Sequence, residues 1–134
     1  LFRSTINLLS AAGIDYVADW VIDDQPTWIQ GTPRPMLSVP YTVELNDIPL
    51  MAIQHHRSDE LYQRGVLQME RLAQESAHNP RVMAISVHPY ITGVPHRIAA
   101  FEKLLDHVQA HADVAIMPGV QVADWYSAQV PPRN

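Results

Sequence analysis

The sequence predicts an α/β fold with a mostly parallel sheet, and three observations support this prediction. Helical and extended patterns alternate along the chain, as they do in parallel α/β proteins. Residues 82–87 form a nearly continuous apolar run, interrupted by Ser86, which is typical of a strand buried on both faces. Residues 58–73 and 98–108 repeat apolar side chains at helical spacing. The length of 134 residues fits one domain of ordinary size.

Short elements separated by loops are expected in the first part of the chain. Residues 4–12 favour a helix that ends near Gly13, and residues 16–20 favour a strand. Loops are expected at residues 23–26 and 32–35, and a turn at Asn46 and Asp47. Extended pieces are expected at residues 36–45, interrupted by Pro40, and at residues 49–53.

Two strong helices and two short strands are expected in the second part. The first helix begins after Ser58, because Ser is a good N-cap and the acidic residues that follow it favour the first turn. It ends before Pro80. The second helix begins after Pro95 and carries one apolar stripe made of Ile98, Phe101, Leu104, Leu105 and Val108. Strands are expected at residues 82–87 and 114–117, and a last helix at residues 120–128.

Composition excludes several classes of function. The chain has no cysteine, so it forms no disulfide, thiolate metal site or cysteine nucleophile. A net charge of -5 without a basic cluster argues against nucleic-acid binding. The apolar runs are far shorter than the roughly 18 residues of a membrane span. The N-terminus lacks a basic region followed by an apolar one, so we expect a cytoplasmic protein. Because it begins with Leu1, we expect a piece of a longer chain.

His88 is the first candidate for chemistry. It follows the predicted strand 82–87 directly, and Pro89 restricts its backbone. Side chains at the C-terminal ends of parallel strands face the ligand site, and imidazole transfers protons at neutral pH. Asp19 lies at another predicted strand end and could hold the His88 ring, while Trp20 could form a pocket wall. The alternatives are a strand-capping histidine, an ordinary loop aspartate and a core tryptophan.

The other histidines give no metal site by spacing. His55 and His56 are adjacent, and adjacent side chains on a strand point to opposite faces. No acidic residue or histidine lies at the spacing of the HExxH zinc motif. We therefore expect loop roles for this pair, and exposed positions for His78, His96, His107 and His111.

Several segments together resemble the polysaccharide deacetylase family. Residues 88–97, His-Pro-Tyr-Ile-Thr-Gly-Val-Pro-His-Arg, match the family's late His-Pro-x-x-x-Gly-x-Pro-x-Arg signature, most closely in the branch that includes metal-free allantoinases. The Asp19-Trp20 pair, with Asp23, Asp24 and Pro26 after it, resembles the preceding motif. Matching segments follow in the same order at Pro40-Tyr41-Thr42, Asn46-Asp47, residues 97–109 and Asp124-Trp125-Tyr126.

The resemblance implies a partial distorted (β/α) barrel, with residues 1–134 as the C-terminal half of the catalytic domain. It implies a hydrolase acting on non-peptide C–N bonds, such as the N-acetyl group of a sugar. His88 would be the general acid, Asp19 the catalytic residue that tunes it, and Trp20 a pocket wall. Substrate contacts are expected from Asn46, Asp47 and Arg97. Complete family enzymes use zinc or another divalent metal, but no metal ligand is expected in this chain.

The family's early Asp and His motifs and its Arg motif have no counterpart here. We therefore expect the chain to be inactive by itself. A complete barrel usually needs roughly 250 residues, so this chain should hold about four of its strands. It should also present an open sheet edge. It should associate with a missing N-terminal half or with itself. Alternatives are a non-catalytic remnant that binds a sugar or a partner, and an allantoinase-like ureide hydrolase. The expected ligand is a carbohydrate or a small amide.

Overall fold

The computed structural model describes residues 4–31 and 33–132, which divide into two compact units. The sheet unit comprises Leu1–Tyr41 and Met117–Asn134, and the helix-pair unit comprises Thr42–Ile116. Thr32, part of the predicted loop 32–35, lies outside the described residues. Within the described part of the chain, no helix is long and apolar enough to cross a membrane.

The sheet unit is built on three short strands. They are β1 (Tyr16–Val17), β2 (Thr27–Ile29) and β3 (Met36–Ser38), in the order β1-β3-β2. β1 pairs with β3 in parallel, with Tyr16 opposite Leu37, whereas β2 pairs with β3 antiparallel, with Trp28 opposite Leu37. The sheet is therefore mixed.

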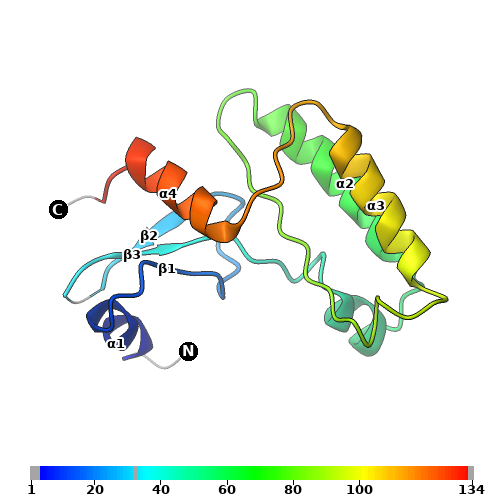
Figure 1. Ribbon diagram of the computed structural model, residues 1–134, viewed down its shortest axis with the longest axis horizontal. Helices are drawn as coiled ribbons and strands as arrows, with labels where there is room; N and C mark the ends of the chain where they lie inside the picture. The colour runs from blue at the N-terminus through cyan, green and yellow to red at the C-terminus, as the bar shows by residue number, and fades with distance from the viewer. Residues whose placement is uncertain (1–3, 32, 133–134) are drawn as a thin grey trace. The chain divides into compact units, whose positions relative to one another are not determined.

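Helices cover both faces of this sheet (Figure 1). Successive side chains of a strand point to opposite faces, so Met36 and Leu37 enter different cores. Met36 packs with Ile6 of α1 (Thr5–Ala11), and Leu37 packs with Ala123 of α4 (Gly119–Gln129). The alternation of two adjacent buried residues on β3 thus produces a helix–sheet–helix sandwich.

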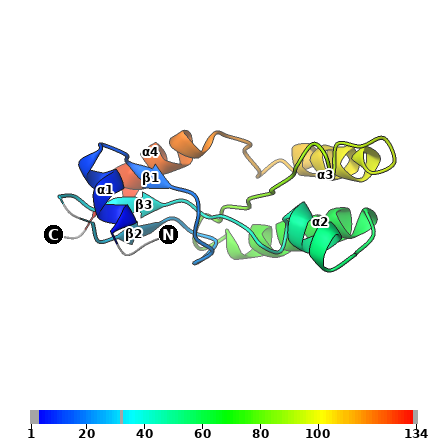
Figure 2. The same ribbon diagram turned by 90° about the horizontal axis from the view of Figure 1, so that it is seen from below.

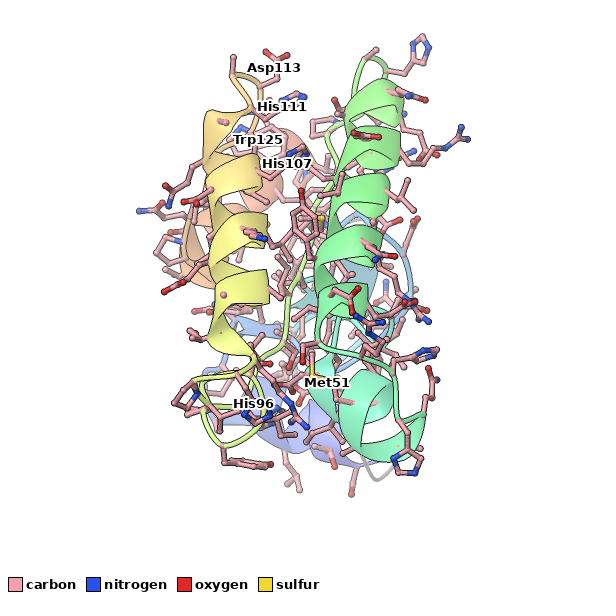
Figure 3. All side chains as sticks on the ribbon, turned by 90° about the vertical axis from the view of Figure 1, so that its right-hand side faces the viewer. Met51, His96, His107, His111, Asp113 and Trp125 are labelled. Atoms are coloured by element: carbon pink, nitrogen blue, oxygen red, sulfur yellow. The ribbon has the colours of Figure 1, made fainter. Side chains whose placement is uncertain are left out.

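The helix-pair unit consists of α2 (Asp59–Glu75), α3 (Ile98–Ala110) and a short π-helical segment, η1 (Ile48–Ile53). The colours of Figure 3 show that α2 and α3 run side by side in the same direction, and Figure 2 shows the same pair from below. Gly65 permits their close approach, because a Cβ there would lie 2.5 Å from a methyl group of the fully buried Leu104. The core of the unit contains Leu45, Leu50, Met51, Leu61, Met69, Ile91, Leu104 and Val108.

The helices are where the sequence predicts them. Helices over residues 4–12, 58–79, 96–109 and 120–128 correspond to α1, α2, α3 and α4, within a few residues at each end. In the sheet unit, β1 and β3 are parallel, but β1, β2 and β3 follow one another without an intervening helix and β2 is antiparallel, so the predicted alternation and the mostly parallel sheet are wrong there. The chain nevertheless combines a sheet with helices. A mixed α/β fold is therefore confirmed.

Four local predictions are wrong. Residues 49–53 are helical, since η1 closes i→i+5 hydrogen bonds such as that from the Gln54 N–H to the Pro49 carbonyl. Asn46 and Asp47 do not form the predicted turn. Asn46 makes a parallel bridge to Ser86, and Asp47 is the N-cap of η1. Residues 82–87 and 114–117 are not regular strands. Strand β2 lies at residues 27–29, for which no element was predicted. Residues 82–87 are apolar enough for a strand, but Ser86 is their only bridged residue in the described chain.

Candidate functional site

A parallel bridge between Asn46 and Ser86 brings together the two segments that form the candidate site. The Ser86 N–H donates to the Leu45 carbonyl at 2.9 Å, and the Asp47 N–H donates to the Ser86 carbonyl at 3.1 Å. These bonds align residues 45–47 with residues 86–88. Asp47 and His88 therefore meet although they are far apart in the sequence.

Asp47 holds His88 through both of its carboxylate oxygens. Oδ1 lies 2.7 Å from the His88 ring atom Nδ1, and Oδ2 accepts the His88 backbone N–H at 2.6 Å. Asp47 is fully buried, whereas the His88 side chain is 32% exposed. The Nδ1 edge of the imidazole is thus held by a buried carboxylate, while the rest of the ring remains partly accessible to solvent.

The turn after His88 adds a third donor to the same carboxylate. The N–H groups of Ile91 and Thr92 both donate to the His88 carbonyl at 2.9 Å, which folds the chain back on itself. The Thr92 hydroxyl then donates to Oδ2 of Asp47 at 2.6 Å. Gly93 is required for this turn, because a Cβ at that position would lie 2.6 Å from the Pro89 carbonyl oxygen.

These contacts keep Asp47 ionised. Burial raises the pKa of the Asp47 carboxyl, but hydrogen bonds from the Thr92 hydroxyl and from the backbone and ring of His88 lower it. The net pKa lies below the ordinary value of the group. A carboxylate held in this way accepts hydrogen bonds and cannot donate one.

The charge of Asp47 decides which ring nitrogen of His88 carries the proton. Because an ionised carboxylate only accepts, Nδ1 must carry a hydrogen, and Nε2 is the nitrogen that gains or loses a proton. Tyr90 lies beside the ring at a centroid distance of 5.5 Å and is 70% exposed. An oriented imidazole of this kind can take a proton from a reacting group or deliver one to it.

Asp19 and Trp20 lie in the sheet unit, unlike His88. The Asp19 side chain is exposed, and Trp20 packs against Ile6, Val17 and Met36. The carboxylate that holds the His88 ring is Asp47, to which the sequence assigned a substrate contact instead. The pocket of the sheet unit measures about 280 Å³ and is lined by other residues, among them Asp15, Tyr16 and Asp124.

Asn46 and Arg97 support the backbone around the site. The Asn46 side-chain oxygen accepts the Ile48 N–H at 3.1 Å, at the start of η1. Arg97 donates from Nη1 to the Ile91 carbonyl at 3.3 Å, within the turn that follows His88. Asn46 therefore supports the backbone after Asp47, and Arg97 supports the turn after His88.

The histidines do not assemble a metal site. Among residues 4–31 and 33–132, no group of three or more His, Asp or Glu side chains could hold a metal ion. The described residues thus do not supply a ligand set for the divalent metal that the resemblance implies. His55 and His56 are exposed, and Nε2 of His56 lies 3.2 Å from Nη2 of Arg64. Figure 3 shows His107 and His111 together at the C-terminal end of α3, with His96 before its first turn.

His107 and His111 differ from the exposed positions expected for them. Both are half-buried, and Nε2 of His107 and Nδ1 of His111 are buried without a hydrogen-bond partner among the described residues. His107 lies in the last turn of α3, and His111 is the C-cap that follows the helix.

Thr92 and the pairing of Asp47 with His88 are the features that sequence reasoning missed. Thr92 lies inside the signature at residues 88–97, but no role was assigned to it. A signal was present, since Thr92 follows His88 by four residues and one tight turn brings its backbone N–H back to the His88 carbonyl. Nothing comparable links Asp47 to His88 in the sequence, because their contact depends on a bridge between distant segments.

Comparison with known proteins supports the resemblance to polysaccharide deacetylases. A "Putative polysaccharide deacetylase" of Schizosaccharomyces pombe (strain 972 / ATCC 24843) is 29% identical over 120 residues, which cover 81% of this chain and 38% of that protein. A search of family models gave no match.

Two solved structures are similar to this chain over nearly its whole length. The crystal structure of Puue allantoinase has a TM-score of 0.89 and 25% identity, and covers 99% of this chain and 45% of that one. A probable polysaccharide deacetylase from Pseudomonas aeruginosa PAO1 has a TM-score of 0.85 and 26% identity, and covers 94% of this chain and 43% of that one. This chain therefore spans less than half the length of the proteins it matches.

Proposed function

We propose that residues 1–134 form the C-terminal half of a hydrolase catalytic domain that acts on non-peptide C–N bonds, with His88 as its proton donor. The observation that carries the proposal is the buried Asp47 carboxylate 2.7 Å from Nδ1 of His88. It orients a partly exposed imidazole through Nδ1, which leaves Nε2 for proton transfer. The similarity to two polysaccharide deacetylases and an allantoinase supports the same reaction class.

A partial distorted (β/α) barrel is the corresponding fold proposal. Its support is the parallel pairing of β1 with β3, the bridge of Asn46 with Ser86, and the helices that follow. In such barrels, side chains at the C-terminal ends of strands form the active site. Asp47 comes directly after the bridged Asn46, and His88 follows the bridged Ser86 by two residues, which agrees with that arrangement.

The proposed reaction assigns one step to this chain. Water adds to the carbonyl carbon of the substrate amide, and the C–N bond of the resulting tetrahedral intermediate then breaks. Protonated His88 transfers its Nε2 proton to the departing nitrogen, which leaves as a neutral amine instead of an unstable anion. Asp47 stabilises the imidazolium before this transfer and keeps Nδ1 protonated after it.

Activation of the water is proposed to come from outside the described residues. A divalent metal bound by a second segment would polarise the carbonyl group, as in complete family enzymes. Asp19, Trp20, Asn46 and Arg97 remain proposed site residues: Asp19 as a catalytic residue, and the other three for substrate. The support for Asn46 and Arg97 is their position next to Asp47 and His88.

We also propose that a second segment covers this chain. Residues 82–85 and 115–116 make no backbone–backbone hydrogen bond within the described part of the chain, although unpaired backbone groups are costly when buried. Ile116 is 66% exposed beside them. A missing N-terminal half is the proposed occupant, because the similar proteins are more than twice as long as the matched region. A second copy of the chain would use the same edges.

The test is hydrolysis by the natural polypeptide that contains residues 1–134. An N-acetylglucosamine oligomer is assayed by acetate release and a cyclic ureide by ring opening, because an allantoinase is among the similar structures. We expect His88→Gln to reduce the turnover of the accepted substrate by about 10²- to 10⁴-fold. His78→Gln, an exposed histidine after α2, should have no effect. Equal activity of His88→Gln and wild type would contradict the proposal, and absence of activity on both classes would favour a non-catalytic binding module.

A further inference from the structure

We propose that Thr92 is a positioning residue: its hydroxyl holds Asp47 in the orientation that keeps the His88 proton on Nδ1. The catalytic consequence rests on the proposed function, but the structural effect does not. Thr92 acts through Asp47 and is not proposed to contact substrate.

Distances and burial single out this contact. The Thr92 hydroxyl lies 2.6 Å from Oδ2 of Asp47, and the two residues are 2% and 0% exposed. No bulk water reaches a contact buried to this degree. If the hydroxyl were removed, solvent would not readily replace it as a donor.

The two carboxylate oxygens have different tasks. Oδ2 accepts two hydrogen bonds, from the Thr92 hydroxyl and from the His88 backbone N–H, whereas Oδ1 faces Nδ1 of the ring. Two donors on one oxygen fix the plane of the carboxylate. Rotation of Asp47 away from the ring would break both of them, so Thr92 helps to hold Oδ1 in line with Nδ1.

The backbone connects Thr92 to His88 rigidly. The Thr92 N–H donates to the His88 carbonyl at 2.9 Å, and Gly93 allows the chain to pass against the Pro89 carbonyl. Ring, carboxylate and hydroxyl therefore belong to one small closed loop of hydrogen bonds. Its geometry does not depend on the sheet unit.

Loss of the Thr92 hydroxyl should change which ring nitrogen of His88 carries the hydrogen. The hydrogen bond from Thr92 lowers the pKa of Asp47, and burial opposes it. Without the hydroxyl, one of the hydrogen bonds that offset burial is lost, so the carboxyl binds a proton more readily. A protonated Asp47 can donate to Nδ1, which forces the neutral His88 ring to carry its hydrogen on Nε2.

The first arm of the test is ¹⁵N NMR of the His88 ring in the 134-residue chain. Wild type and Thr92→Ser, which keeps the hydroxyl, should show the Nδ1–H tautomer in the neutral ring. Thr92→Val, which has the same shape without the hydroxyl, should show the Nε2–H tautomer in a substantial fraction of molecules. If Thr92→Val does not fold, Thr92→Ala removes the same group with a smaller side chain. An unchanged Nδ1–H tautomer in the folded variant would overturn the proposal.

The second arm is the activity of the natural polypeptide. We expect Thr92→Val to lower kcat by about 10- to 100-fold with little change in KM, the range seen when an orienting partner is lost. Thr92→Ser should recover activity to within a few-fold of wild type, and a Ser variant as impaired as Val would count against the proposal. If His88→Gln keeps full activity, the proposed function fails, yet the NMR arm still decides the role of Thr92.

Discussion

Two hydrogen bonds join Asp47 to His88 across 41 positions of sequence: one to the ring at 2.7 Å and one to the backbone at 2.6 Å. The backbone bond fixes the position of the His88 main chain, and the ring bond fixes the orientation of the imidazole. The pair resembles the carboxylate–imidazole unit of other proton-transfer sites, in which the carboxylate selects the tautomer. The predictions below follow from this relationship and from the turn that surrounds it.

Replacing Asp47 by Asn should misdirect the proton of His88. An Asn side chain can donate to Nδ1 through its amide group, so the neutral ring would carry its hydrogen on Nε2. We expect a loss of turnover of up to about 10⁴-fold in the natural polypeptide, the size of the same substitution in a serine-protease triad. The His88 tautomer measured by NMR checks the cause.

Asp106→Asn is the matched control for this substitution. Asp106 is exposed on α3, so its replacement should leave both the tautomer and the turnover unchanged. An Asp47→Asn variant that turns over like Asp106→Asn would show that the carboxylate does not direct His88.

Stability should depend on pH through Asp47. Its pKa is lowered in the folded state from an ordinary value of 3.8, so its contribution is fully present above that value. It is lost as the pH falls through the lower folded pKa. We expect Asp47→Asn to lower the free energy of unfolding by about 2–3 kcal/mol at pH 7, because hydrogen bonds to a charged acceptor are lost.

Urea unfolding of both proteins between pH 7 and pH 2 measures this dependence. The difference between wild type and Asp47→Asn should shrink at the acid end, where the wild-type carboxyl is also neutral. The pKa of Glu75 is likewise lowered, by hydrogen bonds from Arg71 and Arg81. Because Glu75 is present in both proteins, its contribution cancels in the difference between their free energies of unfolding. A difference that stays constant across the range would contradict the ionised state assigned to Asp47.

Gly93→Ala should disrupt the turn after His88. An added Cβ would lie 2.6 Å from the Pro89 carbonyl oxygen, which belongs to backbone and cannot rotate away. We expect a loss of roughly 1–3 kcal/mol in the free energy of unfolding, as in other overpacked sites. Gly119→Ala is the control, because its nearest contact would be an ordinary 3.4 Å to the Tyr16 hydroxyl. Equal stability of the two variants would show that the turn accommodates a side chain.

The chain by itself should associate. Unpaired backbone groups at residues 82–85 and the exposed Ile116 favour pairing with another strand. Light scattering of the purified 134-residue chain should give a mass of at least twice 15.1 kDa, or a mass that rises with concentration. A well-folded monomer at all concentrations would contradict the need for a covering segment.

The helices were predictable because their signals are local. Residues 59–75 and 98–110 carry their own apolar stripes, so no distant residue has to be known, although the Ser58 side chain makes no capping hydrogen bond. The histidine was predictable as well, since His88 and Gly93 are parts of one short signature. The turn that this signature encodes is present, with Gly93 where only a glycine fits.

The strands and the partner of His88 were not predictable, because both depend on distant neighbours. Val82 to Val87 has a strand-like composition, but a strand exists only where another segment pairs with it. For the same reason, the sequence suggested Asp19 for the contact with the His88 ring and gave no sign that Asp47 makes it. The bridge between Asn46 and Ser86 decides in favour of Asp47 for the ring contact.

One measurement tests the role of His88 most directly: the effect of His88→Gln on two substrates of the natural polypeptide that differ in their leaving group. An N-acetyl amide needs a proton on its departing nitrogen, whereas 4-nitrophenyl acetate releases a stable phenolate without one. We predict that His88→Gln slows amide hydrolysis by at least about 100-fold and ester hydrolysis by less than about threefold. Equal losses on both substrates, or no loss on the amide, would contradict the assignment of His88 as the proton donor.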